Sequence, residues 1–291
     1  MGPAVFAGEQ ADGLDHDGRG PSFRLLCDML RLLAIVALVL LSGGGAAAQS
    51  VRFPGVAVGT VLAGPEITGW LYKPPGSGPF PAIVLAHSCS GVNPHTDTWA
   101  KRLTSWGYVV VAPDSFGPRG EKSVCGRGNV VSGNMRVVDI AGALKFLATE
   151  PGVRADRLGL IGHSHGGWTA VRAAQQSYGL ATMGLRAVVA YYPSCSALLD
   201  RAVDVPLLIL IGDKDDWTPA DRCRQLQAAG FARPDLVEAI YYPNAYHAFD
   251  SKSPDRTVMD AAGRTHRLAY DPSAAPDAEA RTKAFFAKYL R

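Results

Sequence analysis

The sequence predicts an α/β fold in which helices cover both faces of a mostly parallel central sheet. Short apolar runs alternate with segments of helical periodicity along most of the chain, and this alternation is typical of parallel strand–helix–strand units. The runs are apolar at consecutive positions, as expected of strands that are buried on both faces. Neither a second core nor a linker is visible after Ser50. We therefore expect one domain over residues 49–291.

The expected elements follow one another in a regular order. Two antiparallel strands come first, at residues 56–61 and 67–72. Strands and helices then alternate: strand 82–86, helix 96–106, strand 108–112, helix 135–149, a strand that leads into Ser164 with a helix behind it, strands 187–191, 205–211 and 237–242, and helix 278–290. A long Gly-rich segment without periodicity, residues 114–134, separates two of these elements, and long loops of this kind are usually functional.

The first 48 residues differ in composition from the rest. Arg31 precedes an apolar run, residues 32–41, and small residues follow it up to Ala48, which is the pattern of a secretory signal peptide. The run is too short to span a bilayer comfortably. We expect an N-terminal extension and signal peptide over residues 1–48, and hence a periplasmic or secreted protein without a stable membrane span after cleavage. Both Met1 and Met29 are possible translation starts.

Composition narrows the possible partners. The formal net charge is +3, from 29 basic and 26 acidic residues, and these charges are dispersed rather than clustered. Nucleic-acid-binding domains carry concentrated basic patches. We therefore expect no nucleic-acid partner.

The most informative motif is Gly-x-Ser-x-Gly, with Ser164 between Gly162 and Gly166. An apolar strand leads into it and a helix follows, which is the setting of a nucleophile elbow. There the central residue takes a strained backbone conformation, and glycines are needed because a Cβ atom would clash in so sharp a turn. The context predicts that Ser164 is a nucleophile.

A nucleophilic serine needs a base, and the base needs an orienting carboxylate. In α/β-hydrolases these residues follow in the order serine, acid, histidine, each after a strand. His247 follows the strand that ends at residue 242 and is the expected base. Three acids follow the strand that ends at residue 211, namely Asp213, Asp215 and Asp216, and their order alone does not choose among them.

Three motifs together resemble the dienelactone hydrolase family of α/β-hydrolases: residues 162–167, 212–219 and 242–249, within a similarity that runs from about residue 68 to 290. In that family the acid stands three residues after the glycine of Gly-x-x-Asp-x-x-x-Pro, which is Asp215 here. Its founding members use a cysteine nucleophile in the cytoplasm on a dienelactone whose carboxylate they hold with arginines. Because this chain has Ser164 and an export signal, the expected substrate is an ester or another lactone.

Two backbone amides are expected to form the oxyanion hole. One belongs to His165, the residue after the nucleophile. The resemblance of the loop at residues 87–93 to the family assigns the other to Cys89. In that loop His87 is expected to be structural. His163 and His165 should diverge across the turn without a third ligand, so we expect no metal and no cofactor.

The mature chain keeps four cysteines, and an even number in an oxidising compartment favours disulfides over free thiols. Four cysteines allow three pairings, and the count alone does not choose. All four follow strand ends where active-site loops gather, and we predict Cys89–Cys125 and Cys195–Cys223. A cysteine nucleophile at Cys89 is disfavoured because that residue lacks the elbow.

The sequence thus predicts a serine hydrolase that cleaves small-molecule carboxylic esters or lactones through an acyl-enzyme, with Ser164, Asp215 and His247 as its triad. A secreted cutinase or polyester hydrolase is the alternative. A peptidase and a non-catalytic binding protein on a hydrolase fold are weaker ones, the latter because all three triad residues are present.

Overall fold

The computed structural model describes Gly2 and residues 48–196 and 200–291. The predicted extension and signal peptide therefore lie outside the described residues, apart from Gly2 and Ala48. The chain divides into two units, Met1–Gly45 and Ala46–Arg291, and the second carries the fold. No helix in the described ranges is long and apolar enough to cross a membrane.

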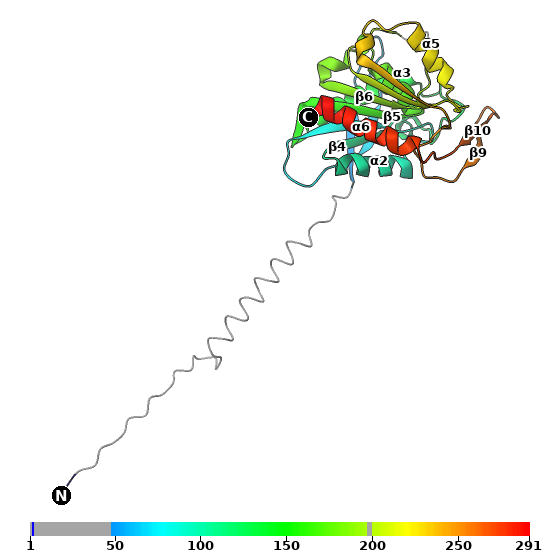
Figure 1. The fold of residues 1–291 in the computed structure, drawn as a ribbon. Helices are drawn as coiled ribbons and strands as arrows, with labels where there is room; N and C mark the ends of the chain where they lie inside the picture. Colours follow the sequence, from blue (N-terminus) through cyan, green and yellow to red (C-terminus); the bar gives the residue numbers. More distant parts are fainter. Residues whose placement is uncertain (1, 3–47, 197–199) are drawn as a thin grey trace. The chain divides into compact units, whose positions relative to one another are not determined.

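An eight-stranded sheet forms the centre of the fold, with the strand order β1-β2-β4-β3-β5-β6-β7-β8 (Figure 1). The strands are β1 (Gln49–Pro54), β2 (Glu66–Tyr72), β3 (Phe80–Ala86), β4 (Val109–Asp114), β5 (Val153–His163), β6 (Leu185–Tyr191), β7 (Leu207–Gly212) and β8 (Val237–Tyr242). β2 runs antiparallel to β1 and β4, whereas β4, β3, β5, β6, β7 and β8 are parallel. The predicted α/β-hydrolase fold is confirmed.

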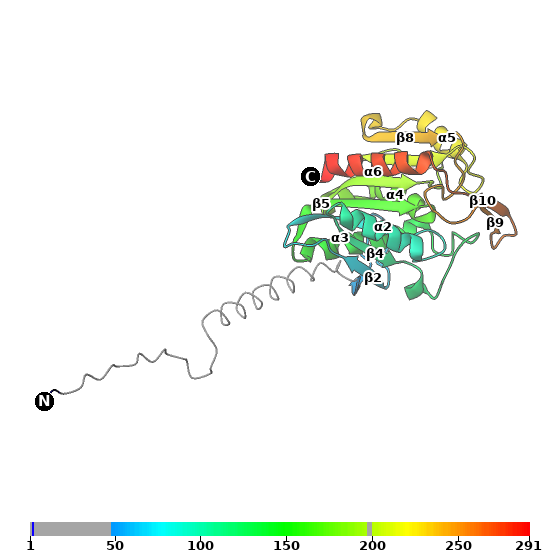
Figure 2. The same ribbon diagram turned by 60° about the horizontal axis from the view of Figure 1, so that its bottom comes forward.

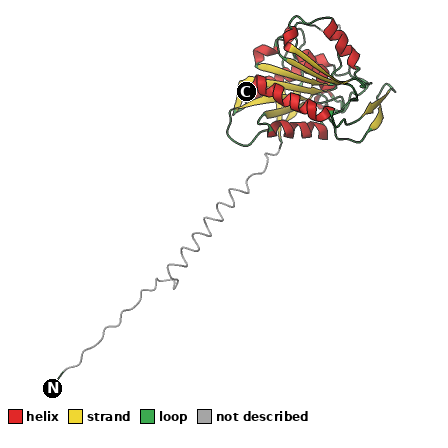
Figure 3. Cartoon of the chain, in the orientation of Figure 1, coloured by secondary structure: helices red, strands yellow, loops and turns green. Residues whose placement is uncertain are grey.

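Helices cover both faces of the sheet, as expected (Figures 2 and 3). On one face α3 (Gly133–Thr149) packs against α4 (His165–Ala173). On the other lie α2 (Pro94–Ser105) and α6 (Ala274–Leu290), where Arg102 and Glu279 form an ion pair at 3.1 Å. α5 (Ala220–Ala228) follows β7. The apolar core fills the two interfaces between sheet and helices, and the central strands are therefore buried along most of their length.

The structure corrects one predicted strand. Residues 56–61 form only an isolated bridge between Val58 and Val61, because Gly59 turns the backbone there with φ = 53°. The strand next to β2 is instead β1, whose Val51 and Phe53 point into the core while their neighbours are exposed. Alternating burial of this kind is typical of a strand with one solvated face.

A helix and a hairpin near the site were also not expected from the sequence. α5 and the two-stranded hairpin of β9 (Arg256–Met259) and β10 (Thr265–Leu268) both follow active-site motifs in the chain. Both are rich in polar residues and largely exposed, so neither shows the apolar runs that mark the buried strands.

Candidate active site

Ser164 lies in a strained turn between β5 and α4. Its backbone has φ = 55° and ψ = −112°, a region that residues with a Cβ atom rarely occupy. A Cβ atom on Gly162 would lie 2.0 Å from the carbonyl oxygen of Gly166, and one on Gly166 would lie 2.1 Å from that of Ala86. The two glycines are therefore required, as the motif predicts, because backbone passes directly over them.

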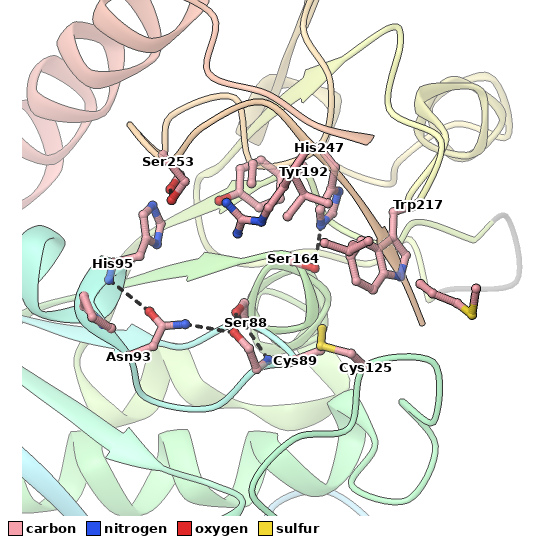
Figure 4. A pocket seen from close by; sticks show the side chains of 18 residues that line it. Ser88, Cys89, Asn93, His95, Cys125, Ser164, Tyr192, Trp217, His247 and Ser253 are labelled. Atoms are coloured by element: carbon pink, nitrogen blue, oxygen red, sulfur yellow. Dashed lines mark hydrogen bonds between the residues drawn. A yellow bond between two sulfur atoms is a disulfide. The ribbon is translucent and has the colours of Figure 1, made fainter. Parts of the chain in front are cut away.

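The side chains of Ser164, His247 and Asp215 form a continuous hydrogen-bonded chain. Ser164 Oγ lies 2.9 Å from His247 Nε2 (Figure 4). On the other side of the ring, His247 Nδ1 lies 2.8 Å from Asp215 Oδ2. All three residues are buried. In this arrangement Nδ1–H donates to the carboxylate, and Nε2 is left to accept the serine proton.

The surroundings of Asp215 fix its carboxylate. Its Oδ1 accepts hydrogen bonds from the backbone amides of Trp217 and Thr218, at 2.9 and 2.8 Å. The other two candidate acids point elsewhere. Asp213 pairs with Arg224 at 2.6 Å, and the carboxylate of Asp216 accepts the backbone amide of Arg267. Of the three acids, Asp215 is the one that the structure brings to His247.

The two predicted oxyanion donors lie beside Ser164. His165 is the first residue of α4, and the first amides of a helix have no partner within the helix. Cys89 follows β3 and lines the same cavities as Ser164. The carbonyl of Cys89 accepts the amide of Val124 at 2.8 Å, so the loop is anchored through that oxygen.

The imidazole of His165 is held from two sides. Its Nδ1 accepts from Arg136 Nη1 at 2.9 Å, and its Nε2–H donates to the carbonyl of Gly128 at 3.0 Å. Burial, together with the charge of Arg136, lowers its pKa to about 3. The ring is therefore neutral at ordinary pH and ties α4 to the loop at residues 114–132.

Arg136, which sequence reasoning missed, is a fully buried cation on α3. Its guanidinium lies 5.1 Å from the ring centre of Phe116. Burial lowers the pKa of Arg136 to about 9, although Asp139 acts in the opposite direction. The periodicity of the surrounding residues predicts that Arg136 lies on a helix, but no local sequence pattern indicates that its side chain is buried.

His87 has the structural role that the sequence predicts. It is buried, its Nε2 accepts the amide of Ser115 at 3.1 Å, and its Nδ1 lies 2.8 Å from the carbonyl of Ser88. Burial, with the nearby charge of Arg136, lowers its pKa well below the ordinary value. A neutral His87 therefore joins the loops that follow β3 and β4.

His163 points away from His165, toward His95 and Asp250. The possible ligand atoms of His95, His163 and Asp250 lie within 4.8 Å of one another, a grouping that the sequence did not reveal. Burial raises the pKa of Asp250, but the charges and hydrogen bonds of its neighbours, first among them His95, together lower it further, so that the net pKa lies below the ordinary value. The pKa of His163 is lowered to about 3, mainly by burial.

Hydrogen bonds already occupy the Asp250 carboxylate. Oδ2 accepts from His95 Nε2 at 2.8 Å and from Trp99 Nε1 at 2.7 Å, and Oδ1 accepts from Tyr192 at 2.8 Å. The ring of Tyr192 in turn packs edge-on against His247, with 4.7 Å between ring centres. The cluster of His95, His163 and Asp250 therefore supports the ring that packs against His247, and we do not treat it as a separate site.

Both predicted disulfides are present. Cys89–Cys125 and Cys195–Cys223 each join Cα atoms 4.9 Å apart. The first connects the loop after β3 with the long loop at residues 114–132, directly beside Ser164. The second ties the segment after β6 to α5.

Two cavities meet at Ser164. The larger, about 460 Å³, extends past His247 and Tyr192 toward the β9–β10 hairpin. The smaller, about 250 Å³, lies over His165 and Trp168. Trp217 and Cys89 line both. Ser164 therefore borders both cavities.

The chain resembles several known proteins at low identity. It is 24% identical over 215 residues to a probable 2-oxo-3-(5-oxofuran-2-ylidene)propanoate lactonase of a Bradyrhizobium species, covering 70% of this chain and 86% of that one. It is 26% identical over 208 residues to a putative carboxymethylenebutenolidase of Yersinia pestis, covering 65% and 76%. The crystal structure of a putative dienelactone hydrolase from Klebsiella pneumoniae superposes with a TM-score of 0.62 at 22% identity, covering 84% of this chain and all of that one.

A family model gives the decisive match. It covers residues 67–290 and describes the dienelactone hydrolase family, in agreement with the resemblance carried by the three sequence motifs. The eight-stranded, mostly parallel sheet has the same fold as the solved structure from Klebsiella pneumoniae. The chain therefore belongs to the dienelactone hydrolase family of α/β-hydrolases.

Proposed function

We propose that this protein is an exported serine hydrolase that cleaves carboxylic esters or lactones through an acyl-enzyme. One observation carries the proposal: Ser164 sits on a strained elbow and is linked by hydrogen bonds of 2.9 and 2.8 Å to His247 and Asp215. A hydroxyl with a base and an orienting carboxylate at these distances is equipped for nucleophilic catalysis.

The reaction begins when Ser164 Oγ attacks the ester carbonyl carbon. His247 Nε2 accepts the serine proton as the Oγ–C bond forms, and the resulting imidazolium is stabilised by Asp215. When the tetrahedral intermediate collapses, the C–O bond to the alcohol breaks and Nε2 returns the proton to the departing oxygen. A water molecule, activated by the same nitrogen, then releases the acid and restores Ser164.

The negative charge on the carbonyl oxygen requires hydrogen-bond donors. We assign this role to the backbone amides of His165 and Cys89. The first lies at the N-terminus of α4, where the helix dipole also favours negative charge. Removal of one such donor typically costs about 3 kcal/mol of transition-state stabilisation.

The names of the relatives and the size of the larger cavity support the proposed substrate class. Two of those relatives are named as a lactonase and a carboxymethylenebutenolidase, so ring-opening of a lactone is within reach of the same chemistry. Serine acylation suits ordinary carboxylic esters equally well. The larger cavity, about 460 Å³, is within the range that small-molecule ligands occupy, which favours a small ester over a polymer.

Export is supported by the disulfides. Cys89–Cys125 and Cys195–Cys223 are both formed, and such bonds persist in oxidising compartments such as the periplasm. Together with the signal-peptide pattern before Ala48, they favour a periplasmic or secreted enzyme.

Replacement of the nucleophile tests the proposal. Ser164→Ala should lower kcat on p-nitrophenyl acetate by about six orders of magnitude, because the base then has no hydroxyl to activate. Ser105→Ala, at the exposed end of α2, is the matched control and should keep full activity. Substantial turnover by Ser164→Ala would show that another residue is the nucleophile, and a wild-type protein that turns over no ester would favour a binding role.

A further inference from the structure

The two cavities that meet at Ser164 differ in the residues that line them. Apolar side chains contribute much of the lining of the larger one, including Ala248, Val258, Met259 and Leu268. The smaller one is lined largely by polar side chains and glycine backbone, including Asn129, Ser194, Thr218 and Arg264. An ester bound at Ser164 has two arms, its acyl group and its alcohol group, and each of them can be bound in one of these two cavities.

The position of His247 determines which arm of the ester is bound in which cavity. His247 is hydrogen-bonded to Ser164. It lines the larger cavity, and it is not among the residues that line the smaller one. Its Nε2 accepts the proton from Ser164 Oγ, 2.9 Å away, and must pass it to the alcohol oxygen when the C–O bond breaks. The alcohol oxygen therefore has to face Nε2, and the group attached to it extends into the cavity that His247 lines.

The acyl arm must then point away from His247. The oxyanion takes the direction of the amides of Cys89 and His165, and the attacked carbon has one substituent left. We place this substituent in the smaller cavity, which Ser164 also lines and His247 does not, and which His165, Trp168 and Trp217 help to line. At about 250 Å³, against about 460 Å³ for the other, it offers less room and more hydrogen-bonding groups.

From this geometry we infer that the preferred substrates are esters of a bulky apolar alcohol with a short polar acid. The inference rests on the proposed serine-hydrolase function and adds the orientation of the substrate to it. The alcohol contacts the β9–β10 hairpin through Val258 and Met259. The acyl group is bound near Ser194 and Asn129. The hairpin is therefore a specificity element for the alcohol.

A pair of isomeric esters separates the two orientations. 2-Naphthylmethyl acetate carries its bulk on the alcohol, and methyl 2-naphthylacetate carries the same bulk on the acid. Both are alkyl esters, and each kcat/KM is divided by the rate constant for alkaline hydrolysis to remove intrinsic reactivity. We expect at least about a tenfold preference for 2-naphthylmethyl acetate, the size of a moderate pocket discrimination. Equal rates or the reverse preference would overturn the inference.

A second pair tests the polarity of the acyl cavity. 2-Naphthylmethyl hydroxyacetate and 2-naphthylmethyl propanoate differ by a hydroxyl in place of a methyl group. The hydroxyacetate should be the better substrate after the same correction, because the acyl cavity offers hydrogen-bonding groups. A preference for the propanoate would contradict a polar acyl site.

Matched variants connect the preference to the two cavities. Ser253 lines only the larger cavity of this pair and Ser194 only the smaller. Ser253→Trp should lower kcat/KM for 2-naphthylmethyl acetate far more than for methyl butanoate. Ser194→Trp should do the opposite and lower kcat/KM for methyl butanoate more. Ser105→Trp on α2 is the bystander control. Exchanged or equal effects of the two cavity variants would contradict the assignment.

Failure of the inference and failure of the proposed function give different results. If neither isomer is hydrolysed and a fluorophosphonate does not label Ser164, the serine-hydrolase function itself is wrong. If the probe labels Ser164 but the isomers are hydrolysed equally, or not at all, the nucleophile stands and the assignment of the cavities is wrong.

Discussion

The disulfide Cys89–Cys125 should matter for catalysis as well as for stability, whereas Cys195–Cys223 should matter for stability alone. Only the first bond holds the loop that carries a proposed oxyanion donor, the Cys89 amide. Replacement of both of its cysteines by alanine keeps that amide but frees the loop. The corresponding double alanine variant of Cys195 and Cys223 is the matched control, since it also removes one disulfide.

The two variants should lose similar stability. The bonds span 36 and 28 positions, and the chain-entropy relation for loops of this length gives about 3.8 and 3.6 kcal/mol at 25 °C. For a domain of this size each kcal/mol corresponds to roughly 2–4 °C in Tm. Thermal unfolding followed by circular dichroism should therefore show a decrease of roughly 7–15 °C for both variants.

Their activities should differ. Complete loss of one oxyanion donor lowers kcat by about 10²–10³, and a loop that is merely freed retains part of the interaction. We expect kcat of the Cys89/Cys125 variant to fall by about ten- to a hundredfold with KM little changed, because the missing interaction belongs to the transition state. The Cys195/Cys223 variant should stay within about threefold of the wild type.

The assay is p-nitrophenyl acetate hydrolysis at 20 °C, after circular dichroism has confirmed that each variant is folded. The reasoning is refuted if the Cys89/Cys125 variant keeps its full kcat, or if both variants lose kcat equally. In either case the loop after β3 does not depend on its disulfide for a catalytic role.

Three other predictions follow from the buried groups. Asp215→Asn should lower kcat by about 10⁴, because an amide no longer holds the imidazole in the required tautomer, whereas Asp213→Asn should change it little; similar losses in ester assays of the two would contradict the choice of acid. The pKa values of His163 and His165 are about 3 in the folded state against 6.5 ordinarily. As the pH falls below 6.5, these two histidines therefore take up protons in the unfolded state while they remain neutral in the folded state. The free energy of unfolding should therefore be highest above pH 6.5 and should fall between pH 6.5 and 3 by up to about 2.7 kcal/mol per pH unit. A free energy of unfolding from urea titrations that does not change across this range would disprove the prediction. Gly162→Ala should prevent folding or abolish activity, since its Cβ would lie 2.0 Å from a carbonyl oxygen, and a soluble, fully active variant would show that the turn can relax.

The parallel strands and the sharp turn at Ser164 could be predicted because their signals are local. Strands buried on both faces need apolar residues at consecutive positions, and β3 and β7 show this in the sequence. Ser164 is marked by the glycines that its turn requires. Choosing Asp215 over its neighbours took the family motif, and the structure gives the reason: Oδ1 of Asp215 is anchored by two amides of its own loop.

The rest depends on contacts between distant residues. Asp250 is surrounded by His95 and Trp99 of α2 and by Tyr192, which follows β6. These partners are far from Asp250 in the sequence, so no local pattern predicts the cluster. Arg136 lies on an ordinary-looking helix, and its burial becomes visible only when α3 packs beside His165. The β9–β10 hairpin was missed for a different reason, since its strands are short and mostly exposed.

The central claim is that Ser164 is a nucleophile activated by His247, and covalent labelling tests it most directly. The protein is treated with a fluorophosphonate, which reacts with activated serines, and the modified peptide is mapped by mass spectrometry. We predict stoichiometric labelling of Ser164 and strongly slowed labelling in His247→Ala, because the base is then missing. Labelling of a different residue, or a folded protein that does not react, would contradict the account.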